Sequence, residues 1–236
     1  MEPQWQWHIA GYIVNANTMI FTWVSMIIVF IMFRLAARKA SIEKPRGLQN
    51  FVELAFDFVG GYVREGLNDE QANRLFRLLV AELMYLLVVN IFSLLPFPFF
   101  HASAADLNTT VGLALIVFVL IHYYGVHYRG GVGHLKSFAS PWGLTPLFLM
   151  EQVTNPATLA MRLFGNIFAG DILMSLASSF IPTRLSLWFG ISFLVSVALQ
   201  LAVLGFNTFI AVMQSFIFMV LTLAYISQNM KPAGEH

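Results

Sequence analysis

The fold class of this chain is decided by "LSLWFGISFLVSVALQLAVLGFNTFIAVMQSFIFMVLTLAYISQNM" (Leu185–Met230), which contains no Asp, Glu, Lys or Arg. As a helix it would be roughly 70 Å long at about 1.5 Å per residue, more than twice the ~30 Å hydrocarbon thickness of a bilayer. Two arrangements fit this length: one long, steeply tilted helix, or a hairpin bent near Gly205–Asn207. Both place the stretch in lipid.

The whole chain has the composition of a membrane protein. Of its 236 residues, 58% are hydrophobic and only 11% are charged, against about 25% charged residues in soluble domains. The absence of cysteine excludes disulfides, thiolate nucleophiles and Cys-ligated metals. A net charge of +1 without a basic tail gives no sign of a nucleic-acid partner.

The hydrophobic pattern predicts a single all-α integral membrane domain, 1–236, with about five transmembrane helices. The segment 47–67 differs from these spans, because its apolar residues recur with helical spacing opposite a polar face. We interpret it as an amphipathic helix at the cytoplasmic interface. The remaining segments are an outer N-terminus at 1–16, spans at 17–35, 75–98 and 108–128, and long tilted helices at 144–181 and 185–229.

The distribution of cations predicts the orientation. Cytoplasmic loops are enriched in Lys and Arg, and the loop after the first span holds Arg34, Arg38, Lys39, Lys44 and Arg46, whereas no cation precedes that span. The N-terminus is therefore expected outside, and Lys231 favours a cytoplasmic C-terminus. These two ends require an odd number of crossings, so we prefer five, with each long segment crossing once as a tilted helix.

A permanent charge interrupts the first long segment, in "TLAMRLFGNIFAGDIL" (Thr158–Leu173). An arginine at mid-bilayer costs from ~2.5 to more than 10 kcal/mol, and it keeps its proton in proteins. Arg162 has long apolar runs on both sides, which disfavours snorkelling to an interface. Asn155, Thr158, Asn166 and Ala169 share its helix face, with Gly165 beside it.

Gly165 and Ala169 form a small-xxx-small pair, which lets another helix approach closely in a membrane. Packing within the chain would explain these small residues but not the cation, so we expect Arg162 to face a partner helix. Asp171 lies about 13.5 Å along the axis in one direction and Glu151 about 16 Å in the other. An acid toward each side of a fixed cation is a plausible layout for two aqueous half-paths.

Neutral amides also occur in the last segment. Asn207 and Gln214 are seven residues apart and share a helix face, and amides in lipid need hydrogen-bond partners. They line a wet path or join helices; both readings stay open for Asn207, and the path is favoured for Gln214. His122, His127 and His134 cluster near one interface, but their spacing fits no tight ligand set, so we expect interfacial histidines, no metal and no cofactor.

At these residues the chain resembles subunit a of the F-type ATP synthases. The resemblance is carried by "RLFGNIFAGDIL" with "LQLAVLGFNTFIAVMQSFIFMVLTLAYIS", and by "LLPFPF" and "ADLNTTVGLALIVF". It covers nearly the whole chain. It implies an ion-translocating subunit of the bacterial plasma membrane that is no enzyme on its own. Its partners would be a c-ring of small hairpin subunits, peripheral-stalk b subunits and the rest of the complex.

The resemblance also implies roles for individual residues. Arg162 would face the ring carboxylate, drive its deprotonation and block a proton short circuit. Asp171 stands where the family usually has Glu, and Asn207 where some members carry His, which puts a His-dependent relay in doubt. The remaining residues of the implied ion path are Asn166, Gln214, Asp106, Asn108 and Glu151.

Two other classes of function compete with this one. A stand-alone secondary transporter could bind an anionic substrate at Arg162, but such transporters usually show internal repeats, and we find none. A structural scaffold leaves Arg162 unexplained. We expect the ion to be a proton, but the sequence itself does not distinguish H⁺ from Na⁺, because in the family that the chain resembles the ring site sets the ion.

Overall fold

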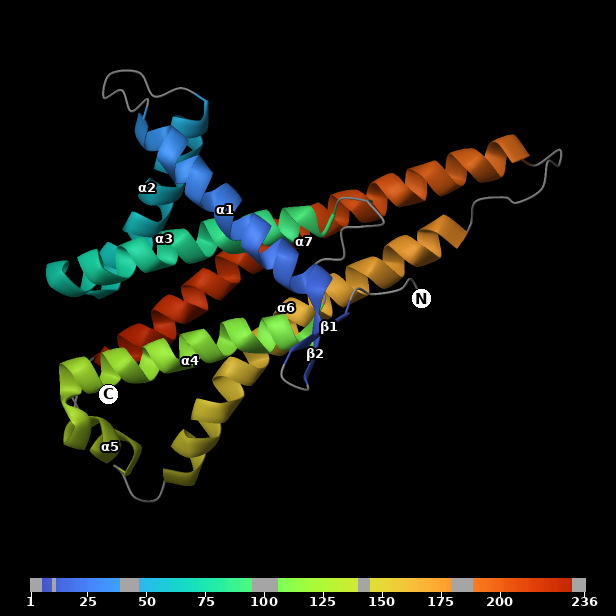
Figure 1. Ribbon diagram of the computed structural model, residues 1–236. Helices are drawn as coiled ribbons and strands as arrows, with labels where there is room; N and C mark the ends of the chain where they lie inside the picture. The colour runs from blue at the N-terminus through green and yellow to red at the C-terminus, as the bar shows by residue number, and fades with distance from the viewer. Residues whose placement is uncertain are drawn as a thin grey trace.

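The computed structural model describes residues 6–9, 12–38, 47–94, 106–139, 145–179 and 189–230. Five of its helices are long and apolar enough to cross a membrane, which confirms the all-α membrane fold (Figure 1). These five are α1 (Ala16–Arg38), α3 (Asp69–Phe92), α4 (Leu107–Arg129), α6 (Thr145–Ser179) and α7 (Phe189–Met230). The other described helices are α2 (Leu48–Gly66) and α5 (Gly131–Ala139).

A short β-hairpin precedes the first helix, and the sequence analysis did not predict it. Strands β1 (Gln6–Ile9) and β2 (Tyr12–Asn15) pair antiparallel, with Trp7 opposite Val14. Aromatic and β-branched residues favour strands, but a pattern of four residues in each strand is too short to distinguish from a loop. The hairpin leads directly into α1 at Ala16.

Helix α3 lies inside the bundle, where it packs against α1, α2 and α7. Leu75, Leu79 and Met84 are among its fully buried side chains. On the outside of the bundle, large apolar side chains are exposed, such as Trp23 at 59% and Leu194 at 68%. Because lipid is as apolar as these side chains, this exposure is what a membrane-embedded bundle requires.

The long C-terminal segment forms one helix, α7, from Phe189 to Met230, and not a hairpin bent near Gly205–Asn207. Helix α6 bends in its first half (Figure 1) and contains Pro156. A proline inside a helix has no N–H for the carbonyl of the residue four positions earlier, here Gln152, and it kinks the helix. The two long helices pack against each other, and α6 also packs against α4.

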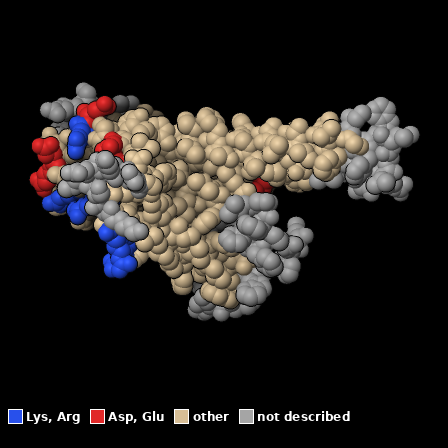
Figure 2. Space-filling model, turned by 90° about the horizontal axis from the view of Figure 1, so that it is seen from above, with Lys and Arg blue, Asp and Glu red and all other residues tan. Residues whose placement is uncertain are grey.

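On the face shown in Figure 2, charged side chains gather at one end of the molecule, on the left, and the elongated remainder of that face shows few of them. This end holds α2, the start of α3 and the end of α4 (Figure 1). Helix α2 turns buried valines, Val52, Val59 and Val63, toward its neighbours. The orientation of the chain, with this end in the cytoplasm, stays a prediction from the cation distribution.

At the same end, His134 fixes α5 on α4. The His134 side chain is only 3% exposed, and its ring lies nearly perpendicular to the ring of His122, with centroids 5.4 Å apart. A Cβ on Gly125 would lie 2.5 Å from the His134 ring, so only glycine fits at that position. Burial lowers the pKa of His134 below its usual 6.5, and His122 and Arg129 lower it further.

The lowered pKa predicts that α5 docks less stably in acid. A base whose pKa is depressed by folding stabilises the fold fully above its unfolded pKa, and part of that stability is lost as the pH falls below 6.5. We expect the amide hydrogen-exchange protection of 131–139 to fall between about pH 7.5 and about pH 5.5. Gly125→Ala should lower it at both pH values, whereas Gly112→Ala, whose Cβ meets nothing within 4 Å, should not. Equal hydrogen-exchange protection at both pH values in the unaltered protein would contradict the role of His134 in the docking of α5.

Candidate functional site

Arg162 points away from the rest of its own chain. It is exposed on α6, as are its neighbour Met161 and, six residues further along the helix, Phe168. The side of the same helix that faces the rest of the bundle is closed, because Ala160 and Leu163 are buried at 3% and 0% exposure. Arg162 makes no hydrogen bond or ion pair with any residue that the structure describes. The ion pair among the described residues joins Arg74 to Glu70, near the start of α3. The guanidinium is therefore available to another molecule.

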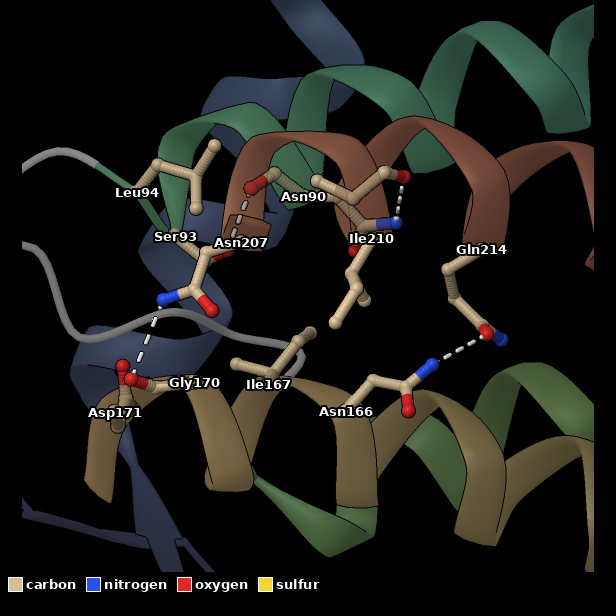
Figure 3. Close-up of a pocket in the computed structure, with 11 residues that line it drawn as sticks. Asn90, Ser93, Leu94, Asn166, Ile167, Gly170, Asp171, Asn207, Ile210 and Gln214 are labelled. Carbon is tan, nitrogen blue, oxygen red and sulfur yellow. Dashed lines mark hydrogen bonds between the residues drawn. The ribbon is translucent and has the colours of Figure 1, made fainter. Parts of the chain in front are cut away.

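A pocket next to Arg162 is formed where α3, α6 and α7 meet, and we call it the Asp171 pocket (Figure 3). It encloses about 420 Å³, counting the part that is open to the outside. It brings together four of the residues that the sequence analysis selected, namely Asn166, Asp171, Asn207 and Gln214. Its other lining residues are Asn90, Ser93, Leu94, Ile167, Gly170, Ile210 and Ala211.

Two amide contacts join α6 and α7 across this pocket (Figure 3). Asn166 Nδ2 donates to Gln214 Oε1 at 2.8 Å, and Asn207 Nδ2 donates to the carbonyl oxygen of Gly170 at 3.3 Å. A Cβ on Gly170 would lie 3.0 Å from the Asn207 amide. Glycine therefore allows Asn207 to approach the backbone beside Asp171.

Asn90 belongs to the same pocket, although the sequence analysis did not select it. Its side chain is 1% exposed, and its Nδ2 donates to the Ala211 carbonyl at 3.2 Å and to Ser215 Oγ at 3.0 Å. Asn90 Oδ1 and Gln214 Nε2 are buried without a hydrogen-bond partner among the described residues. An acceptor and a donor of this kind beside a polar pocket are the partners that a bound water requires.

A second polar pocket, the Glu151 pocket, lies between α4, α6 and α7 and encloses about 630 Å³, including its open part. Arg129 Nη2 donates to the carbonyl oxygen of Gln228 at 2.6 Å on its wall. The sequence analysis selected only Glu151 from this group. The other lining residues are Ile121, Phe148, Gln152, Asn155, Pro156, Tyr225 and Asn229.

Arg162 separates the two pockets along α6. Asn155 of the Glu151 pocket precedes it by two turns, about 10 Å, and Asn166 of the Asp171 pocket follows it by one turn, about 6 Å. An exposed permanent cation thus stands along α6 between the residues that line two separate polar pockets. This order along one helix is the geometric core of the candidate site.

Asp106 and Asn108 are not among the described residues that line the Asp171 pocket. Asp106 Oδ1 accepts from the backbone N–H of Asn108 and caps α4. Its Oδ2 accepts from Asn15 Nδ2 at 3.1 Å and from Thr18 Oγ1 at 3.3 Å. In this structure Asp106 therefore joins the start of α4 to the start of α1. A role for these two residues in an ion path stays a prediction.

The histidine cluster shows no metal-binding arrangement. Within the described ranges, no group of three or more His, Asp or Glu side chains is placed to hold a metal ion. His127 Nε2 instead lies 3.1 Å from Arg74 Nη1, a contact between the ends of α4 and α3.

Comparison with known proteins identifies the family. Residues 19–227 match the family described as ATP synthase A chain. ATP synthase subunit a of Desulforamulus reducens is 33% identical over 231 residues, which cover 98% of this chain and 85% of the relative. ATP synthase subunit a of Priestia megaterium is 34% identical over 237 residues, covering 96% and 95%. The subunit a of Staphylococcus carnosus is 32% identical over 245 residues, covering 100% and 98%. The chain therefore belongs to the ATP synthase A chain family, as a multi-pass protein of the bacterial membrane.

Proposed function

We propose that this chain carries protons to and from the carboxylates of a rotating c-ring, through two half-paths that Arg162 keeps apart. The observation that supports this proposal most is the position of Arg162, exposed and without a described partner, between the Asp171 pocket and the Glu151 pocket. A fixed cation repels protons and other cations, so it prevents a direct leak from one pocket to the other.

The Asp171 pocket is the proposed outer half-path. Asp171 is the one titratable residue among the described residues that line it, and the amides of Asn90, Asn166, Asn207 and Gln214 supply donors and acceptors for water. Such groups allow a proton to reach the ring through hydrogen-bonded water and the carboxylate. With the charged end of the molecule in the cytoplasm, this pocket opens toward the outer side.

The Glu151 pocket is the proposed inner half-path, toward the cytoplasm. Glu151 is its acid, and the side chains of Gln152, Asn155, Gln228 and Asn229 are its neutral polar groups. The membrane potential contributes about 2.3 kcal/mol per charge per 100 mV to movement across both half-paths. The chain alone is no enzyme in this proposal, because nucleotide chemistry belongs to other subunits.

The c-ring would lie against the exposed apolar face of α6 and α7. A cation in hydrocarbon is tolerated when a carboxylate passes close to it, because their attraction rises as the effective dielectric falls. The small side chains Gly165 and Ala169, both unburied, leave room for that approach. Exposed apolar residues on this face of α6 and α7 include Met161, Phe168, Ile172, Leu201, Phe206 and Phe209.

Peripheral-stalk b subunits are the other proposed membrane partners.

A cysteine crosslink tests this arrangement, and the chain contains no cysteine of its own that would interfere. In the assembled complex, Ala169→Cys should form a disulfide with a cysteine placed beside the carboxylate of a ring subunit. The band should appear on a non-reducing gel after oxidation.

The matched control is Ile27→Cys, because Ile27 is also an exposed membrane position, at 56%, but lies on α1. It should give no ring adduct. A disulfide from Ile27→Cys but none from Ala169→Cys, in complexes of equal composition, would refute the proposed ring face.

A further inference from the structure

An apolar groove on the lipid side of the bundle lies apart from both polar pockets, and we call it the Glu82 groove. Its walls come from α1 and α4, with Phe30 and Ile116 among them, and its floor comes from α3 and α7, with Glu82 and Phe218. The groove holds about 1060 Å³, including the part that is open to lipid. Its enclosed cavity of about 450 Å³ lies within the range for sites that bind small molecules.

Glu82 is the one charged residue among the described residues that line the groove. Its Oε1 accepts from Thr222 Oγ1 at 2.9 Å, which joins α3 to α7. Its Oε2 is buried and has no hydrogen-bond partner among the described residues. The half-paths proposed above do not use this carboxyl group, because it lines neither of their pockets.

The depth of Glu82 restricts what can pair with it. Along α3 it lies about 7.5 Å beyond Arg77 and about 15 Å before Phe92, so it is well inside the hydrocarbon. A phospholipid keeps its charged headgroup at the interface and cannot bring it to this depth without a large cost. No Lys, Arg or His is present among the described lining residues to neutralise the carboxyl group.

We propose that the Glu82 groove binds a lipophilic amine: an apolar body that fills the groove, with one amine nitrogen at Glu82 Oε2. The apolar walls select the body by burial of hydrocarbon and aromatic surface. The carboxyl group selects the amine, because an amine and a carboxylic acid share one proton, so the pair carries no net charge wherever that proton resides. Such a neutral pair avoids the cost of an isolated charge in lipid.

The experiment uses the intact ATP synthase complex in phosphatidylcholine vesicles and two photoreactive probes. One probe is a dodecyl-dimethylamine with a diazirine in its chain, and the other is the corresponding uncharged dodecanol. Adducts on α1 and α4 are mapped by mass spectrometry. We expect the amine to label the groove, and Glu82→Gln to reduce that labelling by about tenfold to a hundredfold, the effect of losing a hydrogen bond to a charged group. The alcohol should label both proteins equally weakly.

A second pair of variants tests the groove without changing the carboxyl group. Ile116→Trp fills the wall and should also suppress labelling by the amine, whereas Val119→Trp should leave it unchanged. Both positions are exposed on α4, at 58% and 62%, but only Ile116 lines the groove. Equal amine labelling in the unaltered protein and Glu82→Gln would overturn the proposal. So would the absence of any groove adduct, as expected if the helix of a neighbouring subunit filled the groove.

Discussion

Arg162→Ala is expected to abolish ATP-driven proton pumping while the complex still assembles. The guanidinium is exposed on α6 and makes no hydrogen bond or ion pair with a described residue, so its removal leaves no described residue without its partner. In the proposed mechanism, the variant loses the cation that draws the proton from the ring carboxylate and keeps the Asp171 and Glu151 pockets apart. We expect two effects: no pumping, and a passive proton leak through the membrane sector.

Both effects can be measured on inverted vesicles, with acridine-dye quenching for pumping and an imposed pH gradient for the leak. Met161→Ala is the matched control, because Met161 is the adjacent residue and is also exposed, at 60%. It shortens an exposed side chain without removing a charge, and it should pump. Normal pumping by an assembled Arg162→Ala complex would remove Arg162 from the mechanism.

Asp171→Asn is expected to slow proton transport by about a hundredfold or more, the range for loss of a positioned proton-transfer group. Asparagine keeps the size of aspartate but cannot pass on a proton at neutral pH. Because no other described residue that lines this pocket is titratable, none of those side chains can replace Asp171. The measurement is the rate of ATP synthesis driven by imposed pH gradients, as a function of the outer pH.

A second variant tests the same pocket without altering a titratable group. Gly170→Ala would push the Asn207 amide from its place, because the new Cβ would lie 3.0 Å from it, whereas Gly112→Ala meets nothing within 4 Å and serves as the control. Gly170→Ala should also slow transport, by a smaller factor. An Asp171→Asn complex with an unchanged rate and pH profile would assign the path to other groups.

The membrane-spanning fold could be predicted from the sequence, because hydrophobicity and helix length are local properties. The same holds for Arg162, since a charge inside an apolar helix needs no tertiary information to be recognised. The common face of Asn207 and Gln214 was also predicted, and both line the Asp171 pocket. In each of these cases the helical period carries the information.

Contacts between helices that are distant in the sequence could not be predicted in this way. Asn90 looks like a single amide in an apolar span until α3 packs on α7 and brings Ser215 to it. Asp106 caps α4 through a local contact, but its hydrogen bonds with Asn15 and Thr18 depend on the approach of the start of α1. The choice between a hairpin and one helix for the C-terminal segment also needed the structure, because Gly205 permits both and only packing against α3 and α6 decides.

The Arg162 guanidinium on α6 has no hydrogen-bond or ion-pair partner among the described residues, which has a consequence for how the cell makes this protein. A newly inserted copy that has not yet bound the ring exposes the Arg162 charge to the acyl chains of the bilayer. Exposed apolar faces of α6 and α7 lie beside that charge. That state is costly, so an orphan copy should be short-lived, and biogenesis should add this subunit to a preformed rotor rather than store it free. The side chain proposed to keep the two half-paths apart would thus also limit how long an unassembled copy of the subunit survives.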